Sequence, residues 1–170
     1  SPFYGFFLSK KVDAIDEKSA VKLLARTALV GIKLTDAVVD GVLAKTSCLP
    51  LYLQAFGAAA VEFGLLNKKR VIDSKDGGEC WRMFFENLFF HFEYLENELG
   101  GRKKTAMQAV AQGAQTVSEI SALTGLGIPE LGSYLSRLCE EGFLQRTEPG
   151  KYSFTDPLLK EWILLKIKRV

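Results

Sequence analysis

The strongest constraint on the fold lies in the last third of the chain, where helix signals give way to a hairpin signal. Thr116 and Glu119 have the spacing of a capping box, in which each side chain satisfies a backbone N–H of the other residue. Gly125 then interrupts the helical pattern, and Pro129 follows where the first turn of a new helix is expected. Residues 143–154 have the pattern of strand, turn and strand. This order predicts a winged helix-turn-helix domain with a small β-hairpin wing.

Apolar residues recur at helical spacing through most of the remaining chain, so the fold class expected is mainly α. Asp16 and Thr35 are placed to cap the first two helices, and the polar stretch 67–78 predicts an exposed connection. Gly100-Gly101 marks the expected boundary between a helical domain, 1–100, and the winged-helix domain, 101–170. The helices expected are 16–30, 35–47, 50–66, 79–99, 103–112, 116–124, 128–141 and 156–165.

The expected helix 79–99 is unusually aromatic. Five of the 12 phenylalanines fall within ten residues of it, too many for a solvated surface, so we expect this helix to be buried between neighbours. An alternative is that part of it is a docking face for a domain outside this chain. The five are Phe84, Phe85, Phe89, Phe90 and Phe92.

Composition favours a globular protein, with 48% hydrophobic and 25% charged residues. No apolar run approaches the roughly 18 residues that cross a bilayer, so we expect no membrane association and a cytoplasmic location. Cys48, Cys80 and Cys139 lie far apart and are odd in number, which favours free thiols over a disulfide framework. The apolar start without an initiator Met suggests that the first residues come from within a longer polypeptide.

Basic residues are slightly enriched in the C-terminal part, since residues 102–170 carry 10 basic and 7 acidic groups. In a DNA-binding winged helix the third helix enters the major groove, and here it would expose Ser133, Ser136 and Arg137. That helix carries only one basic residue, which matches a polyanion poorly. Three interpretations of these basic residues therefore stay open: they contact double-stranded DNA, they are solvated surface charges, or the winged helix docks onto a protein. The flanking basic candidates for phosphate contact are Arg102, Lys103, Lys104, Arg146 and Lys151.

Three segments together resemble the C-terminal part of the archaeal-type P-loop ATPases in the STAND branch of AAA+ proteins. They are residues 1–5, residues 48–53 and residues 152–162, which are similar to the SPLYGR-like, GLPxYL and FxDPLLxxW motifs of that family. The resemblance spans nearly the whole chain. It implies that residues 1–100 form a lid over ATP or ADP, which an upstream P-loop domain absent from this chain would bind.

In that family the proline of the second motif lies against the adenine. Carried over, Pro50 would contact nucleotide in the parent protein, with Leu49 and Cys48 beside it. Cys48 stands where the family has glycine, and Phe6 stands where it often has arginine.

The chain itself is not expected to be an enzyme or to hold a cofactor. It contains neither a GxxxxGKS/T motif nor a strand ending in paired acidic residues. His91 is the only histidine and lacks a second His or Cys at helical spacing, so no metal site is expected. The function predicted is that of a regulatory or DNA-engaging segment of an ATPase. Association with further copies of the chain as a homo-oligomer is also possible on the sequence. The alternatives are a free-standing winged-helix transcriptional regulator and a winged helix used for protein docking.

Overall fold

The structure is a computed structural model that describes residues 13–168, so the motif at residues 1–5 and Phe6 lie outside the described residues. The chain divides into two compact units, Ser1–Asn87 and Leu88–Val170. This boundary precedes the expected one because the aromatic helix is broken: α4 ends at Asn87 and α5 begins at Phe89. The helix α5 therefore belongs to unit 2, and each unit is described by itself below.

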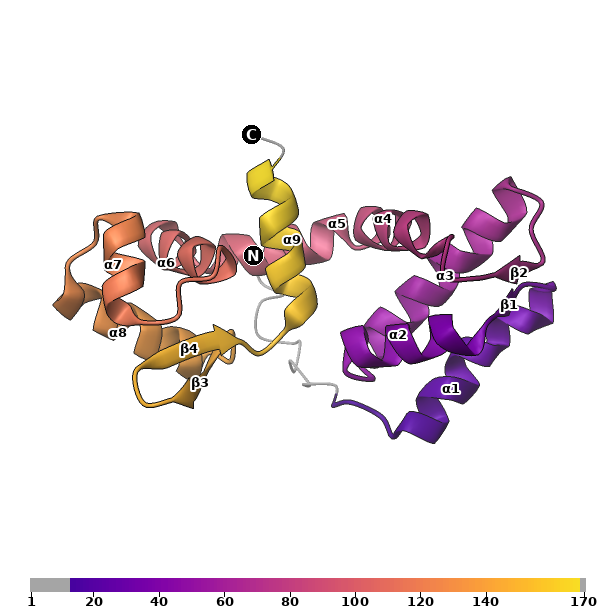
Figure 1. The fold of residues 1–170 in the computed structure, drawn as a ribbon, viewed down its shortest axis with the longest axis horizontal. Coiled ribbons are helices and arrows are strands. Elements are labelled where there is room, and N and C mark those ends of the chain that lie inside the picture. Colours follow the sequence, from indigo (N-terminus) through magenta and orange to yellow (C-terminus); the bar gives the residue numbers. More distant parts are fainter. Residues whose placement is uncertain (1–12, 169–170) are drawn as a thin grey trace, which may run out of the picture. The chain divides into compact units, whose positions relative to one another are not determined.

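Unit 1 is built around the long helix α3, against which α1, α2 and α4 all pack (Figure 1). Only one of the 17 residues of α3 is charged, which is the composition of a helix covered on most sides. Phe56 and Phe84 are fully buried where α3 meets α4. The elements are α1 (Glu17–Ala25), the 3-10 helix η1 (Arg26–Val30), β1 (Lys33–Leu34), α2 (Asp36–Thr46), α3 (Pro50–Leu66), β2 (Val71–Ile72) and α4 (Gly77–Asn87).

Local sequence accounts for the ends of the first two helices in different ways. Asp16 caps α1, and its carboxylate accepts the backbone N–H of Ser19 at 2.9 Å. Gly31 ends η1 with φ of 78°, a left-handed conformation that glycine adopts without strain. Thr35 occupies the N-cap position of α2 as expected, but its side chain makes no capping hydrogen bond.

The polar stretch 67–78 is only partly an exposed connection. Within it β2 pairs in parallel with β1, and the Lys33 N–H donates to the Arg70 carbonyl at 2.8 Å. Asp76 is 6% exposed and accepts a hydrogen bond from Lys69, an ion pair that holds the pKa of the Asp76 carboxyl below its usual value. Ile72 is also buried. The stretch therefore closes one end of unit 1.

Unit 2 is a three-helix cluster with a hairpin beside α8, followed by α9 (Figure 1). Leu131, Leu135 and Leu138 form the fully buried face of α8 against α6 and α7. The strands β3 and β4 pair antiparallel, and the sequence prediction of a helix-turn-helix with a hairpin wing is confirmed. The elements are α5 (Phe89–Glu98), α6 (Gly101–Ala111), α7 (Val117–Thr124), α8 (Ile128–Glu140), β3 (Leu144–Glu148), β4 (Lys151–Phe154) and α9 (Pro157–Lys168).

The aromatic segment is buried only in part, contrary to the expectation for the whole of it. Phe84, Phe85 and Phe92 are buried, but Phe89 is 39% exposed and Phe90 is 84% exposed. In the described part of the chain no helix is long and apolar enough to cross a bilayer.

Candidate functional site

The loop before α3 is the first candidate site. Ser47 and Cys48 both adopt left-handed backbone conformations, with φ of 48° and 55°, and Pro50 is the first residue of α3. The Cys48 carbonyl accepts the N–H of Ile15 at 3.0 Å. Leu49 is extended, and its N–H donates to the Thr46 carbonyl at 3.0 Å. The loop is therefore held by hydrogen bonds on both sides of the turn.

The three loop residues expected to contact nucleotide do lie together. Cys48, Leu49 and Pro50 are half-buried, so Leu49 and Pro50 keep apolar surface on which a flat ring can pack. The backbone at Cys48 lies in the region that favours glycine, which is the residue found there in the family that the chain resembles. A side chain at this position costs about 1 kcal/mol. Contact with nucleotide stays a prediction.

The winged-helix face is the second candidate site. The capping box is present, because the Thr116 hydroxyl accepts the Glu119 N–H and the Glu119 carboxylate accepts the Thr116 N–H at 2.9 Å. The hairpin is hydrogen-bonded to the residue before this cap, because the Tyr152 N–H donates to the Gln115 carbonyl at 2.9 Å. The capping box and this bond hold the wing beside the start of α7.

Ser133, Ser136 and Arg137 lie on α8 as predicted, with Ser133 and Arg137 exposed and Ser136 half-buried. The Arg146 guanidinium donates to the Ser136 hydroxyl at 3.3 Å and lies over the Tyr152 ring. The structure therefore brings α8 and the wing together through Ser136 and Arg146.

Four of the basic residues predicted to contact phosphate instead form ion pairs with carboxylates inside unit 2. Two of these pairs clamp α6 to the ends of α8, where they join Arg102 to Glu130 and Lys103 to Glu141. The pairs formed by the other two lysines are Lys104–Glu96 at 2.9 Å and Lys151–Glu148 at 2.7 Å. Pairing lowers the positive potential that a phosphate would meet. Of the basic candidates, Arg137 and Arg146 make no ion pair within the described residues.

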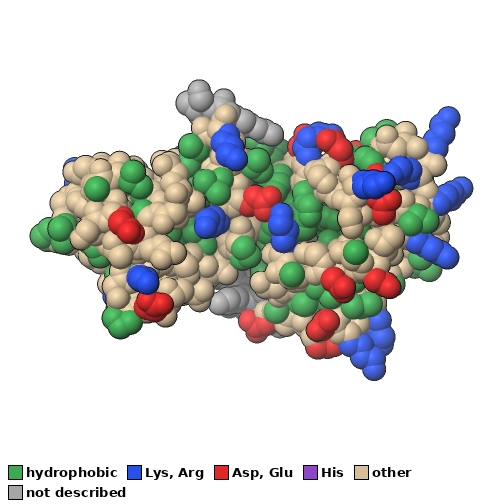
Figure 2. All heavy atoms as spheres, viewed as in Figure 1, with side chains coloured by type: hydrophobic (Ala, Val, Ile, Leu, Met, Phe, Trp, Pro, Cys, Tyr) green, Lys and Arg blue, Asp and Glu red, His purple; other side chains and the backbone are tan. Residues whose placement is uncertain are grey.

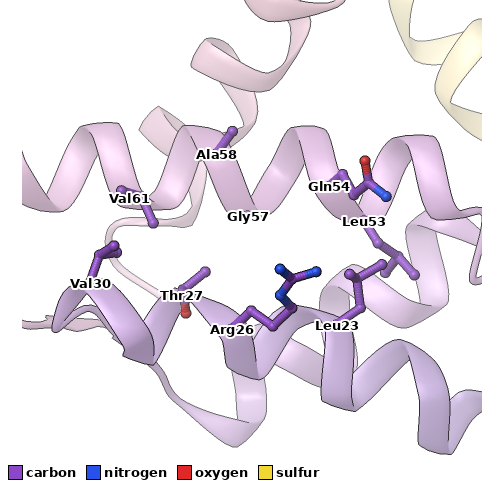
Figure 3. Close-up of a pocket in the computed structure, with 9 residues that line it drawn as sticks. All are labelled: Leu23, Arg26, Thr27, Val30, Leu53, Gln54, Gly57, Ala58 and Val61. Carbon is purple, nitrogen blue, oxygen red and sulfur yellow. The ribbon is translucent and has the colours of Figure 1, made fainter.

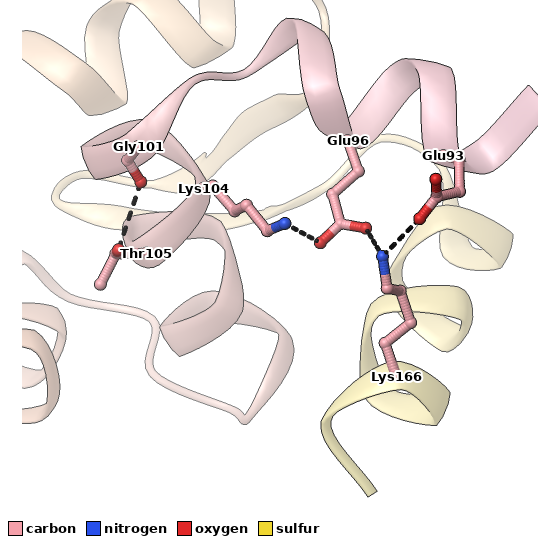
Figure 4. A network of polar contacts seen from close by, with 6 residues as sticks. All are labelled: Glu93, Glu96, Gly101, Lys104, Thr105 and Lys166. Atoms are coloured by element: carbon pink, nitrogen blue, oxygen red, sulfur yellow. Dashed lines mark hydrogen bonds and ion pairs between the residues drawn. The ribbon is translucent and has the colours of Figure 1, made fainter. Parts of the chain in front are cut away.

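Sequence reasoning missed the buried acid that holds Lys104. Glu96 is 2% exposed and accepts hydrogen bonds from Lys104 of α6 and Lys166 of α9, while Glu93 also pairs with Lys166 at 2.8 Å (Figure 4). Burial raises the pKa of Glu96, but the two lysines outweigh it and the pKa lies below its usual value. The sequence does carry a signal for this burial: Glu96 follows Phe92 by four residues, which places it on the apolar stripe of α5.

No other cluster in the described residues carries chemistry that we recognise. His91 is half-buried, and burial lowers its pKa despite the nearby charge of Asp156. Burial raises the pKa of the Cys80 thiol to about 11, and burial also raises that of Cys139, so neither is an activated nucleophile. Across residues 13–168 no three His, Cys, Asp or Glu side chains are placed to hold a metal ion.

Comparisons with known proteins give a likeness of fold. No protein-family model matches the chain, and none of the curated proteins matches it. A solved Walker-type ATPase of Pyrococcus abyssi matches 89% of this chain with a TM-score of 0.66 and 18% sequence identity. The chain spans 42% of the length of that ATPase. At this identity the match shows a shared fold.

A second solved structure, RuvB of Thermotoga maritima, aligns with 91% of this chain and 50% of its own chain at 18% identity. Its TM-score is 0.38, too low for an argument about this protein.

Proposed function

We propose that this chain is the C-terminal regulatory segment of a P-loop ATPase of the archaeal STAND type, with unit 1 as the lid and unit 2 as a winged-helix contact module. The observation that carries the proposal is the match of fold, at a TM-score of 0.66 over 89% of this chain, with part of a Walker-type ATPase. The resemblance of residues 48–53 and 152–162 to motifs of that family supports it. The chain by itself hydrolyses no ATP, since its sequence lacks a P-loop.

In this proposal ATP or ADP is bound by a P-loop domain outside the chain, and the apolar surfaces of Leu49 and Pro50 cover the base. The hydrogen bonds of Cys48 and Leu49 support such a role because they fix the loop before any ligand arrives. Closure of the lid would then alter what unit 2 contacts.

The test uses the longer polypeptide, expressed from the complete reading frame. Pro50→Ala is expected to raise KM for ATP about fivefold with a smaller change in kcat, because it removes a contact with the base. Pro129→Ala is the matched control, since Pro129 also lies in the first turn of a helix but belongs to unit 2. An unchanged KM in Pro50→Ala, or a reading frame without a P-loop, overturns the proposal. The second outcome favours a free-standing winged-helix regulator.

For unit 2 we propose a protein partner in preference to double-stranded DNA. The ion pairs of Arg102, Lys103, Lys104 and Lys151 support this choice because they leave few cations for phosphate. DNA remains the second candidate, favoured by the Arg146–Ser136 bond that joins wing and α8. Duplex binding measured at two salt concentrations separates the two, because phosphate contacts make the affinity depend steeply on salt.

A further inference from the structure

A groove of about 440 Å³ runs between η1 and α3 in unit 1 (Figure 3). It is lined by Leu23, Arg26, Thr27 and Val30 on one side and by Leu53, Gln54, Gly57, Ala58 and Val61 on the other. We call it the η1–α3 groove. It begins one turn after Pro50, so it is separate from the loop proposed to cover nucleotide.

The floor of the groove is built from small residues. Thr27 is 7% exposed, and a Cβ placed on Gly57 would lie 3.6 Å from its Cγ2 atom. Ala58 is exposed beside it. Across this floor Val30 faces Val61, and Arg26 lies on the same side as Leu23 (Figure 3). An apolar side chain inserted here would meet apolar walls and a floor that is already packed.

A second cavity of about 270 Å³ lies at the C-terminal end of α3, where Leu65 is among the residues that line it. On α3 itself, Gln54, Ala58, Val61 and Leu65 follow one another at spacings of three to four residues, so they share one face of the helix over a rise of about 16 Å, or three helical turns. The groove occupies the part of this face from Gln54 to Val61. This spacing matches the way an amphipathic helix binds, with anchors at i, i+3 or i+4, and i+7.

Basic side chains lie beside both cavities. Arg26 lines the groove, Lys22 lies one helical turn before it in the sequence, and Lys68 and Arg70 line the second cavity. Figure 2 shows Lys and Arg side chains that project from the end of the molecule at the right-hand edge of the view. None of the four makes an ion pair within the described residues. Glu62 is the only acid in α3. The partner surface complementary to these cations is acidic.

We propose that the η1–α3 groove binds an amphipathic helix from a partner protein, with an apolar stripe that enters the groove and carboxylates that face Arg26 and the cations around it. Val30 lines the groove and is 53% exposed, and Leu65 lines the second cavity and is 62% exposed, as expected at an interaction site rather than on a solvated surface. Their sequence neighbours Leu29 and Leu66 are more exposed still. The recessed floor favours a peptide over a flat bilayer.

The probe is a fluorescein-labelled synthetic helix with leucines at i, i+4, i+7 and i+11 and glutamates on its flanks, titrated with this chain. A second peptide carries lysines in place of the glutamates. We expect the acidic peptide to bind at least tenfold more tightly than the basic one at 50 mM salt, and to weaken at 300 mM salt. Equal binding of the two peptides, or none, overturns the proposal. Binding only to anionic lipid vesicles overturns it in favour of a membrane surface.

Variants locate the binding. Ala58→Trp fills the groove from an exposed position and is expected to weaken the acidic peptide at least tenfold, whereas Ala44→Trp, on the exposed surface of α2, leaves it within twofold. Arg26→Glu is expected to weaken binding of the acidic peptide and to strengthen binding of the basic peptide. Urea midpoints within error of the unchanged chain show that each variant is folded. An Ala58→Trp variant that binds normally removes the groove as the site, and KM for ATP in the longer polypeptide is unaffected by this outcome.

Discussion

At the scale of single residues, Cys48 has a backbone conformation that its side chain disfavours. Its φ of 55° follows the left-handed Ser47, so relief of strain in Cys48→Gly opposes the extra chain entropy that glycine loses on folding. We expect Cys48→Gly to lie within about 1 kcal/mol of the unchanged chain, and Cys48→Val to lose about 2 kcal/mol because branching at Cβ worsens the strain. Urea unfolding measures both. A glycine variant less stable than the valine variant would contradict this view of the loop.

Glu96 is a second residue whose role is defined by its surroundings. Its folded pKa lies below the usual 4.5, so its contribution to stability is present above pH 4.5 and is lost as pH falls through the folded pKa. Glu96→Gln is expected to destabilise the chain by about 1–3 kcal/mol at pH 7 and to flatten the loss of stability as pH falls below 4.5. Glu93→Gln is the control, with a smaller effect because Glu93 is 34% exposed. Parallel pH profiles for Glu96→Gln and the unchanged chain would contradict the assignment.

At the scale of elements, the end of α3 depends on a glycine that packs against Ile32, the residue before β1. A Cβ on Gly64 would lie 2.7 Å from the Ile32 Cδ1 and 3.1 Å from the Lys69 carbonyl oxygen, so the side chain and the turn would have to move. Gly64→Ala is expected to destabilise by about 1–3 kcal/mol. Gly41→Ala, in α2 with open space around it, is expected to stabilise by about 0.5–1 kcal/mol. Urea midpoints that move in the same direction for both would refute this explanation.

The sequence predicted the helices of both units but not where the aromatic one breaks. Phe84, Leu88 and Phe92 are all buried at intervals of four, so the apolar stripe continues through the break, and neither Gly nor Pro marks it. The strands β1 and β2 have two residues each, too few for an alternating pattern. Long periodic elements were therefore predictable, whereas features fixed by tertiary packing were not.

At the scale of the whole molecule, the sequence predicted which residues lie at the candidate site but not which of their charges are paired with carboxylates. The sequence correctly grouped Ser133, Ser136 and Arg137 on one helix, since their spacing alone determines it. The partners of Arg102 and Lys103 lie 28 and 38 residues away, so only the packing of α6 on α8 reveals them. Pairs of this kind decide whether a basic stretch attracts phosphate.

The difference between paired and unpaired cations predicts how strongly salt weakens binding of duplex DNA. Fluorescence anisotropy at 50 and 200 mM salt measures this. Each phosphate contact adds about −0.9 to the slope of log K against log salt. Arg137 and Arg146 are the two basic candidates that make no ion pair within the described residues, so with these two as the phosphate contacts we expect about a tenfold loss of affinity, whereas six contacts would give a loss of about a thousandfold.

The ion pairs themselves are the control for this measurement. Glu130→Gln with Glu141→Gln frees Arg102 and Lys103, so the double variant is expected to bind the duplex more tightly and with a steeper salt slope. A steep slope already present in the unchanged chain would mean that phosphate outcompetes the carboxylates, and unit 2 would then be a DNA-binding module. A shallow slope that steepens only in the double variant would mean that these pairs keep the winged helix off DNA, which leaves its face to a protein partner.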